Sequence, residues 1–242
     1  MENFNPIARK YASIDLSGRK ALKNEQVREF PGFSEDLRDR FSAALIFDKD
    51  SEALLKQKVV SRVKEIGGKY GIKFLLAGED YPLHSTVLEG KIEIPAVAGD
   101  KNSEEDDRIS IIRETQNDTE LQEELSKLAG IHITYKYLLL DKGSILLTGM
   151  DIPSEMLAAR TALNKIYSKH DIAAIPLENI LHISIARMEE IPREDQSETF
   201  QGYKEEMIKL RHEISSDPLD LKVSYISSDE SYRFLTGNKA DK

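Results

Sequence analysis

Two short stretches of the sequence place a histidine two residues before a hydroxyl side chain. The first reads LHSTV over residues 83–87, and the second reads LHISI over residues 181–185. In a β-strand, residues i and i+2 point to the same face, so each stretch presents an imidazole beside a hydroxyl. Two such strands brought together would present two imidazoles and two hydroxyls to one cleft.

That set of groups suits cleavage of a phosphoester without a metal. Histidine titrates near neutral pH, so a neutral imidazole can take the proton of the attacking oxygen while a protonated one gives a proton to the leaving oxygen. Hydroxyls can donate to the non-bridging phosphate oxygens, where charge builds up. The sequence therefore predicts His84 and His182 as the catalytic pair, and Thr86 and Ser184 as phosphate-binding residues.

A third histidine shows that the bare triplet is a loose signal. His132 also precedes a hydroxyl residue, Thr134, by two positions. It lacks the leading leucine and the trailing aliphatic residue, and it lies outside the repeat described next. We therefore interpret His132 as a structural histidine at the start of a strand.

The elements around the two stretches repeat one plan. A strand at 41–47, a helix from about 51 and a strand at about 83–94 precede a second strand, helix and strand at about 144–150, 153 onward and 180–188. Further patterns predict a helix near 119–128, a strand at 131–140, a helix at 197–214 and a strand at 219–226. The repeat predicts an α+β fold of two pseudo-symmetric lobes, each a small, mainly antiparallel sheet with outer helices and a cleft between them.

The predicted organisation is an N-terminal leader, one two-lobed domain and a tail. The leader, residues 1–40, is expected to pack on the domain. The domain spans 41–230, with lobes of about 41–130 and 131–230, and the tail is 231–242. The acidic stretch 99–107 is poor in apolar residues and predicts a mobile loop.

Composition excludes several classes of protein. The chain has 242 residues, a formal net charge of −9 and no cysteine. Thiolate zinc sites, iron–sulfur clusters and cysteine nucleophiles are therefore excluded. No apolar run is long enough to span a membrane, and no secretory signal is visible, so we expect a cytoplasmic protein. The acidic balance argues against an extensive nucleic-acid surface, and we expect a monomer.

With these two motifs in matched units, the sequence resembles the two-histidine (2H) phosphoesterase superfamily, also called LigT-like. His84/Thr86 and His182/Ser184 match its two His-x-Thr/Ser motifs, and the likeness covers about residues 41–227. The leader with its Phe-Pro-Gly-Phe segment departs from the common core. It is similar to an uncharacterised subgroup that also has an acidic residue and glycine after the first motif, as in Glu89-Gly90.

The resemblance implies a phosphodiesterase that needs no metal or cofactor. Substrates in the family include 2′,3′-cyclic phosphate ends of RNA, cyclic ADP-ribose phosphates, 2′-5′-linked oligoadenylates, RNA 3′ ends and cyclic oligonucleotide signals. The net charge favours a small nucleotide or an RNA 3′ end as the substrate of this chain.

Two further residues are candidates for substrate contact. Arg187 matches a basic residue that often follows the second motif, and it is a candidate phosphate ligand. On an unbroken strand its odd spacing from His182 places it on the opposite face, whereas a bulge returns it to the histidine's face. Tyr81 is a candidate for stacking on a base, and a packed loop tyrosine is the alternative.

Three other functions compete with catalysis by two histidines. A non-catalytic nucleotide- or RNA-binding module on the same fold has no need of a paired acid and base. A metal-dependent hydrolase is disfavoured because no ligand spacing such as His-x-Glu-x-x-His is present. Activity that a chelator does not affect would distinguish two-histidine catalysis from this alternative. A scaffold that binds a partner through residues 99–107 is the remaining alternative, against a merely solvated acidic stretch.

Overall fold

The computed structural model describes residues 6–23, 28–94, 101–175, 180–191 and 196–236. The helices are α1 (Pro6–Lys23), α2 (Lys49–Leu55), α3 (Ser61–Lys69), α4 (Lys101–Gln116), α5 (Thr119–Ser126), α6 (Ser154–Lys169), α7 (Gln196–Ser216) and α8 (Ser231–Thr236), with a 3-10 turn η1 (Glu35–Asp39) and a π-helical turn (Lys56–Val60) between α2 and α3. The strands are β1 (Arg40–Phe47), β2 (Lys73–Leu76), β3 (His84–Ile92), β4 (His132–Leu140), β5 (Ser144–Gly149), β6 (Ile172–Ile175), β7 (His182–Glu190) and β8 (Leu219–Glu230).

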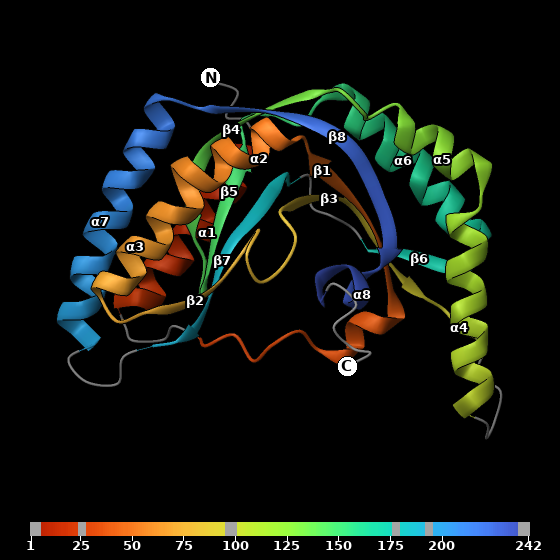
Figure 1. Cartoon of the computed structure of the whole chain (residues 1–242), viewed down its shortest axis with the longest axis horizontal. Coiled ribbons are helices and arrows are strands. Elements are labelled where there is room, and N and C mark those ends of the chain that lie inside the picture. Colours follow the sequence, from red (N-terminus) through yellow and green to blue (C-terminus); the bar gives the residue numbers. More distant parts are fainter. Residues whose placement is uncertain (1–5, 24–27, 95–100, 176–179, 192–195, 237–242) are drawn as a thin grey trace.

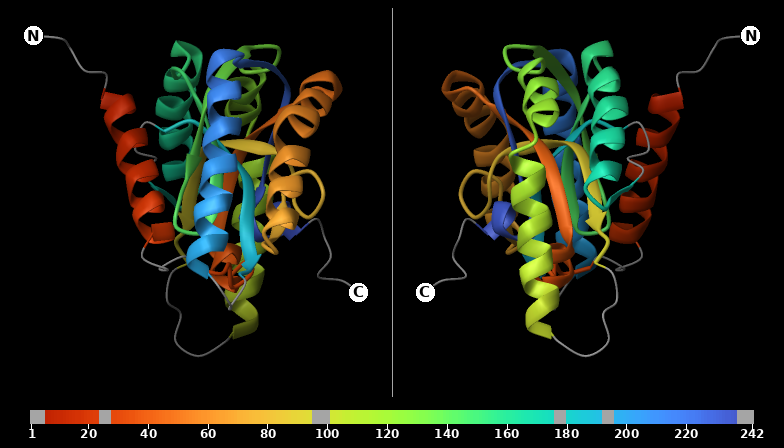
Figure 2. Two further views of the ribbon diagram at one scale, coloured as in Figure 1. Left: turned by 90° about the vertical axis from the view of Figure 1, so that its left-hand side faces the viewer. Right: turned by 90° about the vertical axis from the view of Figure 1, so that its right-hand side faces the viewer.

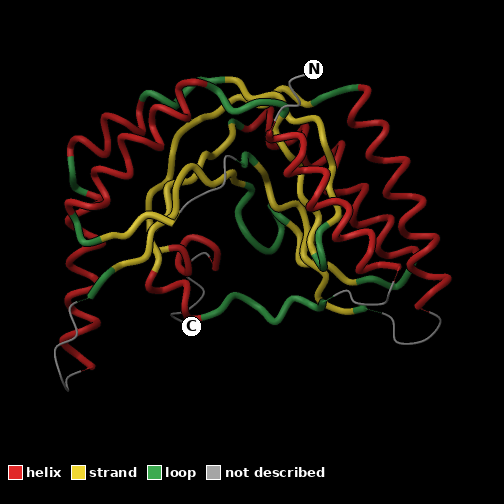
Figure 3. The backbone as a smooth tube through the Cα atoms, turned by 180° about the vertical axis from the view of Figure 1, so that it is seen from behind, coloured by secondary structure: helices red, strands yellow, loops and turns green. Residues whose placement is uncertain are grey.

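The described strands form one antiparallel sheet with internal symmetry. Its order is β2-β7-β5-β4-β8-β1-β3-β6, and β7 also pairs with β3. Exchanging β1 with β5, β2 with β6, β3 with β7 and β4 with β8 reverses this order and reproduces it, so a pseudo-two-fold relates the two halves. Figure 3 shows the sheet as a curved layer with the long helices on its outer side. The predicted α+β fold of two pseudo-symmetric halves is confirmed.

The two halves of the sheet are not the two halves of the chain. The short strand β2 pairs with β7, and its symmetry mate β6 pairs with β3, so each repeat sends a strand into the other half. β8 likewise pairs with β1 as well as with β4. The boundary expected near residue 130 therefore does not divide the sheet, because each half is completed by strands from both parts of the chain.

Helices cover the outer face of each half (Figures 1 and 2). α1, α3 and α7 pack against the half that holds β2 and β4, and α4, α5 and α6 pack against the half that holds β8, β3 and β6. Their apolar faces bury fully enclosed side chains, among them Leu55, Leu121, Leu163 and Tyr203. This apolar burial fixes the strands that carry the two motifs.

The leader contains a helix that the sequence patterns did not predict. α1 packs on β4 and α7 and buries Tyr11 and Asp15. The Asp15 carboxylate accepts from Arg211 at 2.6 Å and pairs with Arg19. A side chain at Gly18 would collide with the carbonyl oxygen of Leu140, so glycine allows the close approach. A charged residue and a glycine on the packed face weaken the apolar periodicity from which a helix is predicted.

The acidic stretch predicted as a mobile loop is helical from residue 101, where α4 begins; its residues 99 and 100 lie outside the described part of the chain. Arg108, Ile112 and Thr115 are buried at helical spacing. Two of these buried residues are an arginine and a threonine, so the buried face of α4 lacks the aliphatic periodicity by which a helix is predicted from the sequence. The hypothesis of a scaffold that binds a partner through 99–107 assumed a loop, and the described part of this stretch is helical instead.

Residues 231–236 of the predicted tail form α8, whereas the remainder of that tail, residues 237–242, lies outside the described residues. Among the described helices, none has both the length and the apolar character that a membrane crossing requires.

Candidate active site

The two motif strands meet where β3 crosses β7. Ser85 of β3 pairs with Ile183 of β7 in antiparallel register. Antiparallel neighbours step in opposite directions from such a pair. His84 therefore lies toward Ser184, and by the same symmetry the second histidine lies toward Thr86. The crossing brings both motifs, 98 residues apart in the sequence, to one place.

One extra residue in each strand changes which side chains face the crossing. The partners of β3 in β1 skip Val87, and the partners of β7 in β5 skip Ile185. Each skipped residue is a β-bulge three positions after the histidine, so the fifth position returns to the histidine's face. Those fifth positions hold Glu89 and Arg187. Of the two alternatives for Arg187, the structure therefore has the bulged strand, which places Arg187 on the same face as His182.

A cavity of about 380 Å³ lies at the crossing. Its lining includes all four motif side chains, His84, Thr86, His182 and Ser184, together with Arg187. Five of the six residues predicted as site residues thus face one pocket. They come from β3 and β7, which are symmetry mates in the sheet.

The sixth predicted residue, Tyr81, does not line this pocket. Its side chain is 4% exposed, and its hydroxyl donates to the backbone carbonyl of Ser184 at 3.1 Å. Its ring packs edge-on against Phe33, with the ring centres 5.8 Å apart. Burial raises the pKa of the Tyr81 hydroxyl. Tyr81 is therefore a packed loop tyrosine, the alternative given above, and the structure does not support stacking of a base on it.

The two imidazoles are half-buried where β3 crosses β7. Nδ1 of His84 lies 2.8 Å from the carbonyl oxygen of Pro82, so this nitrogen carries the proton and donates it, which leaves Nε2 unprotonated in the neutral ring. Burial lowers the pKa of His84. Burial, and then the positive charges of His84 and Arg187, lower the pKa of His182 to about 4. Both rings are therefore neutral at pH 7.

Acid is expected to destabilise the fold through these histidines. An unfolded histidine has a pKa of about 6.5, so between pH 6.5 and 4 the unfolded chain binds protons that the folded chain refuses. The free energy of unfolding should fall as pH falls through this window, by about 2–3 kcal/mol for His182 alone. Urea unfolding at pH 7 and 4.5 measures the loss.

The matched comparison is the His84→Gln/His182→Gln variant, which should lose less stability between the two pH values by at least that amount. A His132→Gln variant is the control, because this exposed histidine lies outside the pocket, where its Nδ1 is 2.7 Å from Oδ2 of Asp220. If the double variant and the unsubstituted protein lose the same stability, the histidines do not titrate as their burial requires.

A segment of the leader crosses the open side of the pocket. We call residues 28–34 the strap; it runs from the end of β7 to η1 (Figure 1). The backbone N–H of Arg28 donates to Lys142, and that of Phe30 donates to Met188 at 2.6 Å. Gly32 has a φ of 95°, a left-handed conformation that favours glycine. The strap thus closes one side of the cavity by backbone contacts to the sheet.

The strap also holds Arg187. The guanidinium carbon lies 4.7 Å from the ring centre of Phe30 and 5.5 Å from that of Phe33. Nε of Arg187 is buried without a hydrogen-bond partner among the described residues. An arginine stacked on two rings, with a donor unused, presents its positive charge to the pocket. Neither phenylalanine was predicted as a site residue, although both belong to the Phe-Pro-Gly-Phe segment noted in the leader.

α8 covers the pocket beside His84. The ring centre of Phe234 lies 4.9 Å from that of the imidazole, and the two rings are perpendicular. At the start of α8, Ser231 shares a 2.6 Å hydrogen bond with Ser42 of β1. Ser42, Ser231 and Phe234 all line the pocket. A six-residue helix in the predicted tail therefore supplies part of the site.

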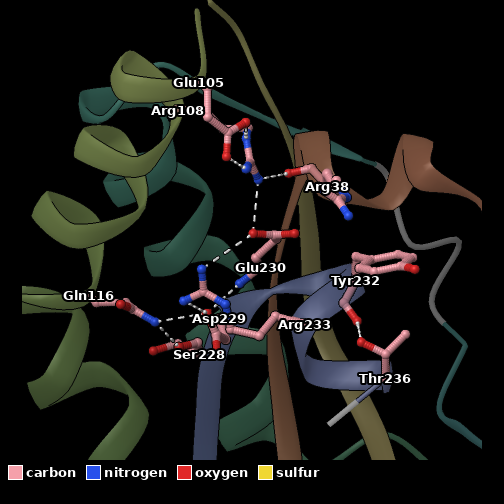
Figure 4. A network of polar contacts seen from close by, with 10 residues as sticks. All are labelled: Arg38, Glu105, Arg108, Gln116, Ser228, Asp229, Glu230, Tyr232, Arg233 and Thr236. Atoms are coloured by element: carbon pink, nitrogen blue, oxygen red, sulfur yellow. Dashed lines mark hydrogen bonds and ion pairs between the residues drawn. The ribbon is translucent and has the colours of Figure 1, made fainter. Parts of the chain in front are cut away.

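A buried ion pair anchors the junction of β8 and α8 (Figure 4). Arg108 of α4 and Glu230 have side chains that are each 6% exposed, and they lie 2.8 Å apart. Arg108 also donates to the backbone carbonyl of Arg38 in η1 at 3.0 Å. The pair thus ties α4 to both elements that border the pocket, and losing one partner would leave the other charge buried and alone.

A second buried arginine holds the two motif strands together from behind. Nε of Arg160 in α6 donates to the carbonyl of Val87, the bulged residue, and Nη2 donates to the carbonyl of Ile180 before β7, both at 2.8 Å. The side chain is 9% exposed. Nothing in the sequence indicated this role, because Arg160 lies on a face of α6 whose other residues are apolar. It is a positioning residue, since it reaches the motif strands and not the cavity.

Replacing Arg160 by methionine is expected to destabilise the fold by about 2 kcal/mol, because two buried carbonyls lose their donors. The motif strands lose a common clamp, so kcat should fall roughly tenfold while KM changes less. Urea unfolding and steady-state kinetics measure both effects. The control is Arg62→Met, which removes an exposed arginine paired with Glu213. A stability loss with unchanged kcat would show that the clamp does not position the motifs.

No group of three or more histidine and carboxylate side chains with the spacing of a metal site occurs among the described residues.

Comparison with known proteins gives structural likenesses at low identity. No protein-family model and no curated protein matches the chain. The PDE domain of MHV ns2 is 12% identical, with a TM-score of 0.41, and the match covers 63% of this chain and 85% of that one. Usb1 of Kluyveromyces marxianus with uridine monophosphate is 11% identical, with a TM-score of 0.40, covering 81% and 95%.

A third structure, ATU0111, a conserved protein of unknown function from Agrobacterium tumefaciens str. C58, is 10% identical, with a TM-score of 0.48, covering 90% of this chain and 95% of that one. The chain is thus similar to a PDE domain, to Usb1 and to a protein of unknown function, and the chemistry proposed below rests on its own pocket.

Proposed function

We propose that this protein is a metal-independent phosphodiesterase that acts on a nucleotide or RNA-end 2′ or 3′ phosphoester. The observation that carries the proposal is the pocket lining: both histidines, both hydroxyls and Arg187 line one cavity. A proton acceptor, a proton donor, two neutral donors for phosphate oxygens and one cation are the groups that metal-free phosphoester cleavage requires. A cavity that served only to bind would not need the paired imidazoles.

The reaction divides between the two histidines. One neutral imidazole takes a proton from water, or from a ribose hydroxyl next to the phosphate, as that oxygen forms a bond to phosphorus. The other imidazole, protonated once the anionic substrate has entered, gives its proton to the oxygen whose bond to phosphorus breaks. The hydroxyls of Thr86 and Ser184 donate to the non-bridging oxygens, and Arg187 offsets their charge.

Pocket size and cover favour a small substrate. A cavity of about 380 Å³ lies at the small end of ligand sites, which run from about 300 to 1,000 Å³. The strap and α8 border it, so a mononucleotide or a strand end fits this site better than the interior of a long RNA. Phe30, Phe33 and Phe234 line the cavity and offer rings for a nucleobase, the role first expected of Tyr81.

A substrate panel in excess EDTA tests the proposal. It contains nucleoside 2′,3′-cyclic phosphates, 2′-5′-linked oligoadenylate, RNA with a 2′,3′-cyclic phosphate end, and cyclic dinucleotides. We expect cleavage of at least one member, unchanged by the chelator and by His132→Ala, a variant at the one other His-x-Thr triplet of the sequence. Binding without cleavage across the panel would favour the non-catalytic module, and loss of cleavage in EDTA would favour a metal-dependent hydrolase.

A further inference from the structure

The pseudo-symmetry of the pocket is broken by charge at one matched pair of positions. Glu89 and Arg187 each stand five residues after a motif histidine, and each returns to the pocket face through a bulge at Val87 or Ile185. Both line the cavity. The matched positions of β3 and β7 that line the cavity agree in imidazole and hydroxyl, so the exchange of a cation for an anion is the main chemical difference between these two strands.

The Glu89 carboxylate is held loosely by its neighbours. Nη1 of Arg40 lies 3.4 Å from one oxygen, and Oγ of Ser231 lies 3.5 Å from the other. Both separations are at the long limit of a hydrogen bond. The side chain is 20% exposed and that of Arg40 is 38% exposed. The carboxylate therefore keeps acceptor capacity directed into the cavity, unlike Glu230, which is sealed against Arg108.

The lining residues that carry a charge whatever the protonation of the histidines add to one positive unit. Arg40 and Arg187 are cations, and Glu89 is an anion. A phosphodiester carries one negative charge, and a phosphomonoester carries nearly two above its second pKa of about 6. At the same position, the Glu89 carboxylate therefore repels the monoester about twice as strongly as the diester, whether or not an imidazole is protonated.

We propose that Glu89 makes the pocket selective for singly charged phosphodiesters and rejects the doubly charged phosphomonoester. The inference rests on the proposed function and deepens it. Hydrolysis adds water to the diester, breaks one phosphorus–oxygen bond and releases a proton above pH 6, so the product carries one more negative charge than the substrate. A carboxylate beside the reacting phosphate thus weakens product binding and favours release.

Binding to a protein that cannot turn over its ligand tests this directly. The background is His84→Gln/His182→Gln, in which both replacements are neutral amides. Calorimetry at pH 8 compares uridine and adenosine 2′,3′-cyclic phosphates with the corresponding 3′-phosphates, and the readout is the ratio of monoester Kd to diester Kd. Glu89→Gln, added to the background, should lower this ratio about tenfold, equivalent to about 1.4 kcal/mol.

Two further variants separate charge from shape. Glu89→Asp keeps the carboxylate and should keep the ratio of the background protein. Glu213→Gln removes a carboxylate that pairs with Arg62 at 3.1 Å outside the pocket, and it should leave the ratio unchanged.

The outcomes are distinct. A lower ratio in Glu89→Gln, and not in the other two variants, supports the selection by charge. An unchanged ratio with the cyclic phosphates still bound would overturn it, because Glu89 would then only support Arg40 and Ser231. Failure of every ligand to bind any of these proteins, with the fold intact by circular dichroism, would overturn the proposed function and the inference with it.

Discussion

Replacing either motif histidine by alanine is expected to lower kcat/KM by about 10³-fold on the best substrate of the panel. Proton transfer by a positioned histidine contributes roughly 10²- to 10⁴-fold, and each imidazole serves one of the two transfers. The fold should survive, because both side chains face a cavity and fill no part of the apolar core. Steady-state kinetics of His84→Ala and His182→Ala, with circular dichroism of each, measure the effect.

The double variant adds a sharper test of the same pair. Groups that act as a unit lose activity non-additively, so His84→Ala/His182→Ala should be little worse than the poorer single variant. His132→Ala is the matched control, because its imidazole is exposed and bonded to Asp220 on another face. Full activity in either single motif variant would remove that histidine from the mechanism and, with it, the acid–base pair.

The second large effect is expected at Arg187. Arg187→Gln should lower kcat/KM about 10²-fold, since a cation that meets the developing phosphate charge is lost from a buried site. Dimethyl phosphate, a singly charged diester, should also inhibit this variant more weakly than the unsubstituted protein. Lysine restores the charge but not the planar group stacked on Phe30 and Phe33, so Arg187→Lys should recover only part of the activity.

Arg113→Gln is the control for this series, because Arg113 is an exposed arginine on α4 and does not line the cavity. Each variant is compared by kinetics and by thermal unfolding. If Arg187→Gln lowers the melting temperature and leaves kcat/KM and inhibition by dimethyl phosphate unchanged, Arg187 only fastens the strap to β7.

The sequence predicted the parts of the fold that follow strong periodic patterns. β1, β3, β5 and β7 and the helices after β1 and β5 follow the expected repeat, and the sheet order confirms their pseudo-symmetry. The motif residues lie on strands as expected, because alternation places His84 and Thr86 on one face whatever the partner strand is.

The missed elements are those whose pattern is short or polar. β2 and β6 have four residues each and pair with strands far away in sequence, so no local signal marks them. α1 and α4 bury Asp15 and Arg108, charged residues whose ion pairs form only in the folded chain. A buried charge that is paired in the folded protein looks like an exposed residue in a sequence pattern. For this reason no helix was predicted in the leader, and the start of α4 was predicted as a mobile loop.

The missed site residues come from tertiary structure. Glu89 was missed, and the direction of the predicted residue Arg187 was left open, because register shifts against β1 and β5 create the bulges that turn both toward the pocket. A bulge has no signature in one strand alone. The repeat still offered a hint, because both residues stand five positions after a histidine. The strap reaches the pocket through backbone hydrogen bonds to Lys142 and Met188, and α8 reaches it by packing on η1 and β1. No local spacing in the sequence encodes these contacts.

The rate of cleavage of the best panel substrate in excess EDTA, by the unsubstituted protein and by His84→Ala/His182→Ala, is the most direct test of metal-free catalysis by two histidines. We predict cleavage that the chelator does not slow, and a loss of at least about 10³-fold in a folded double variant. Equal rates in the two proteins, or a rate that EDTA abolishes and added metal restores, would contradict the mechanism.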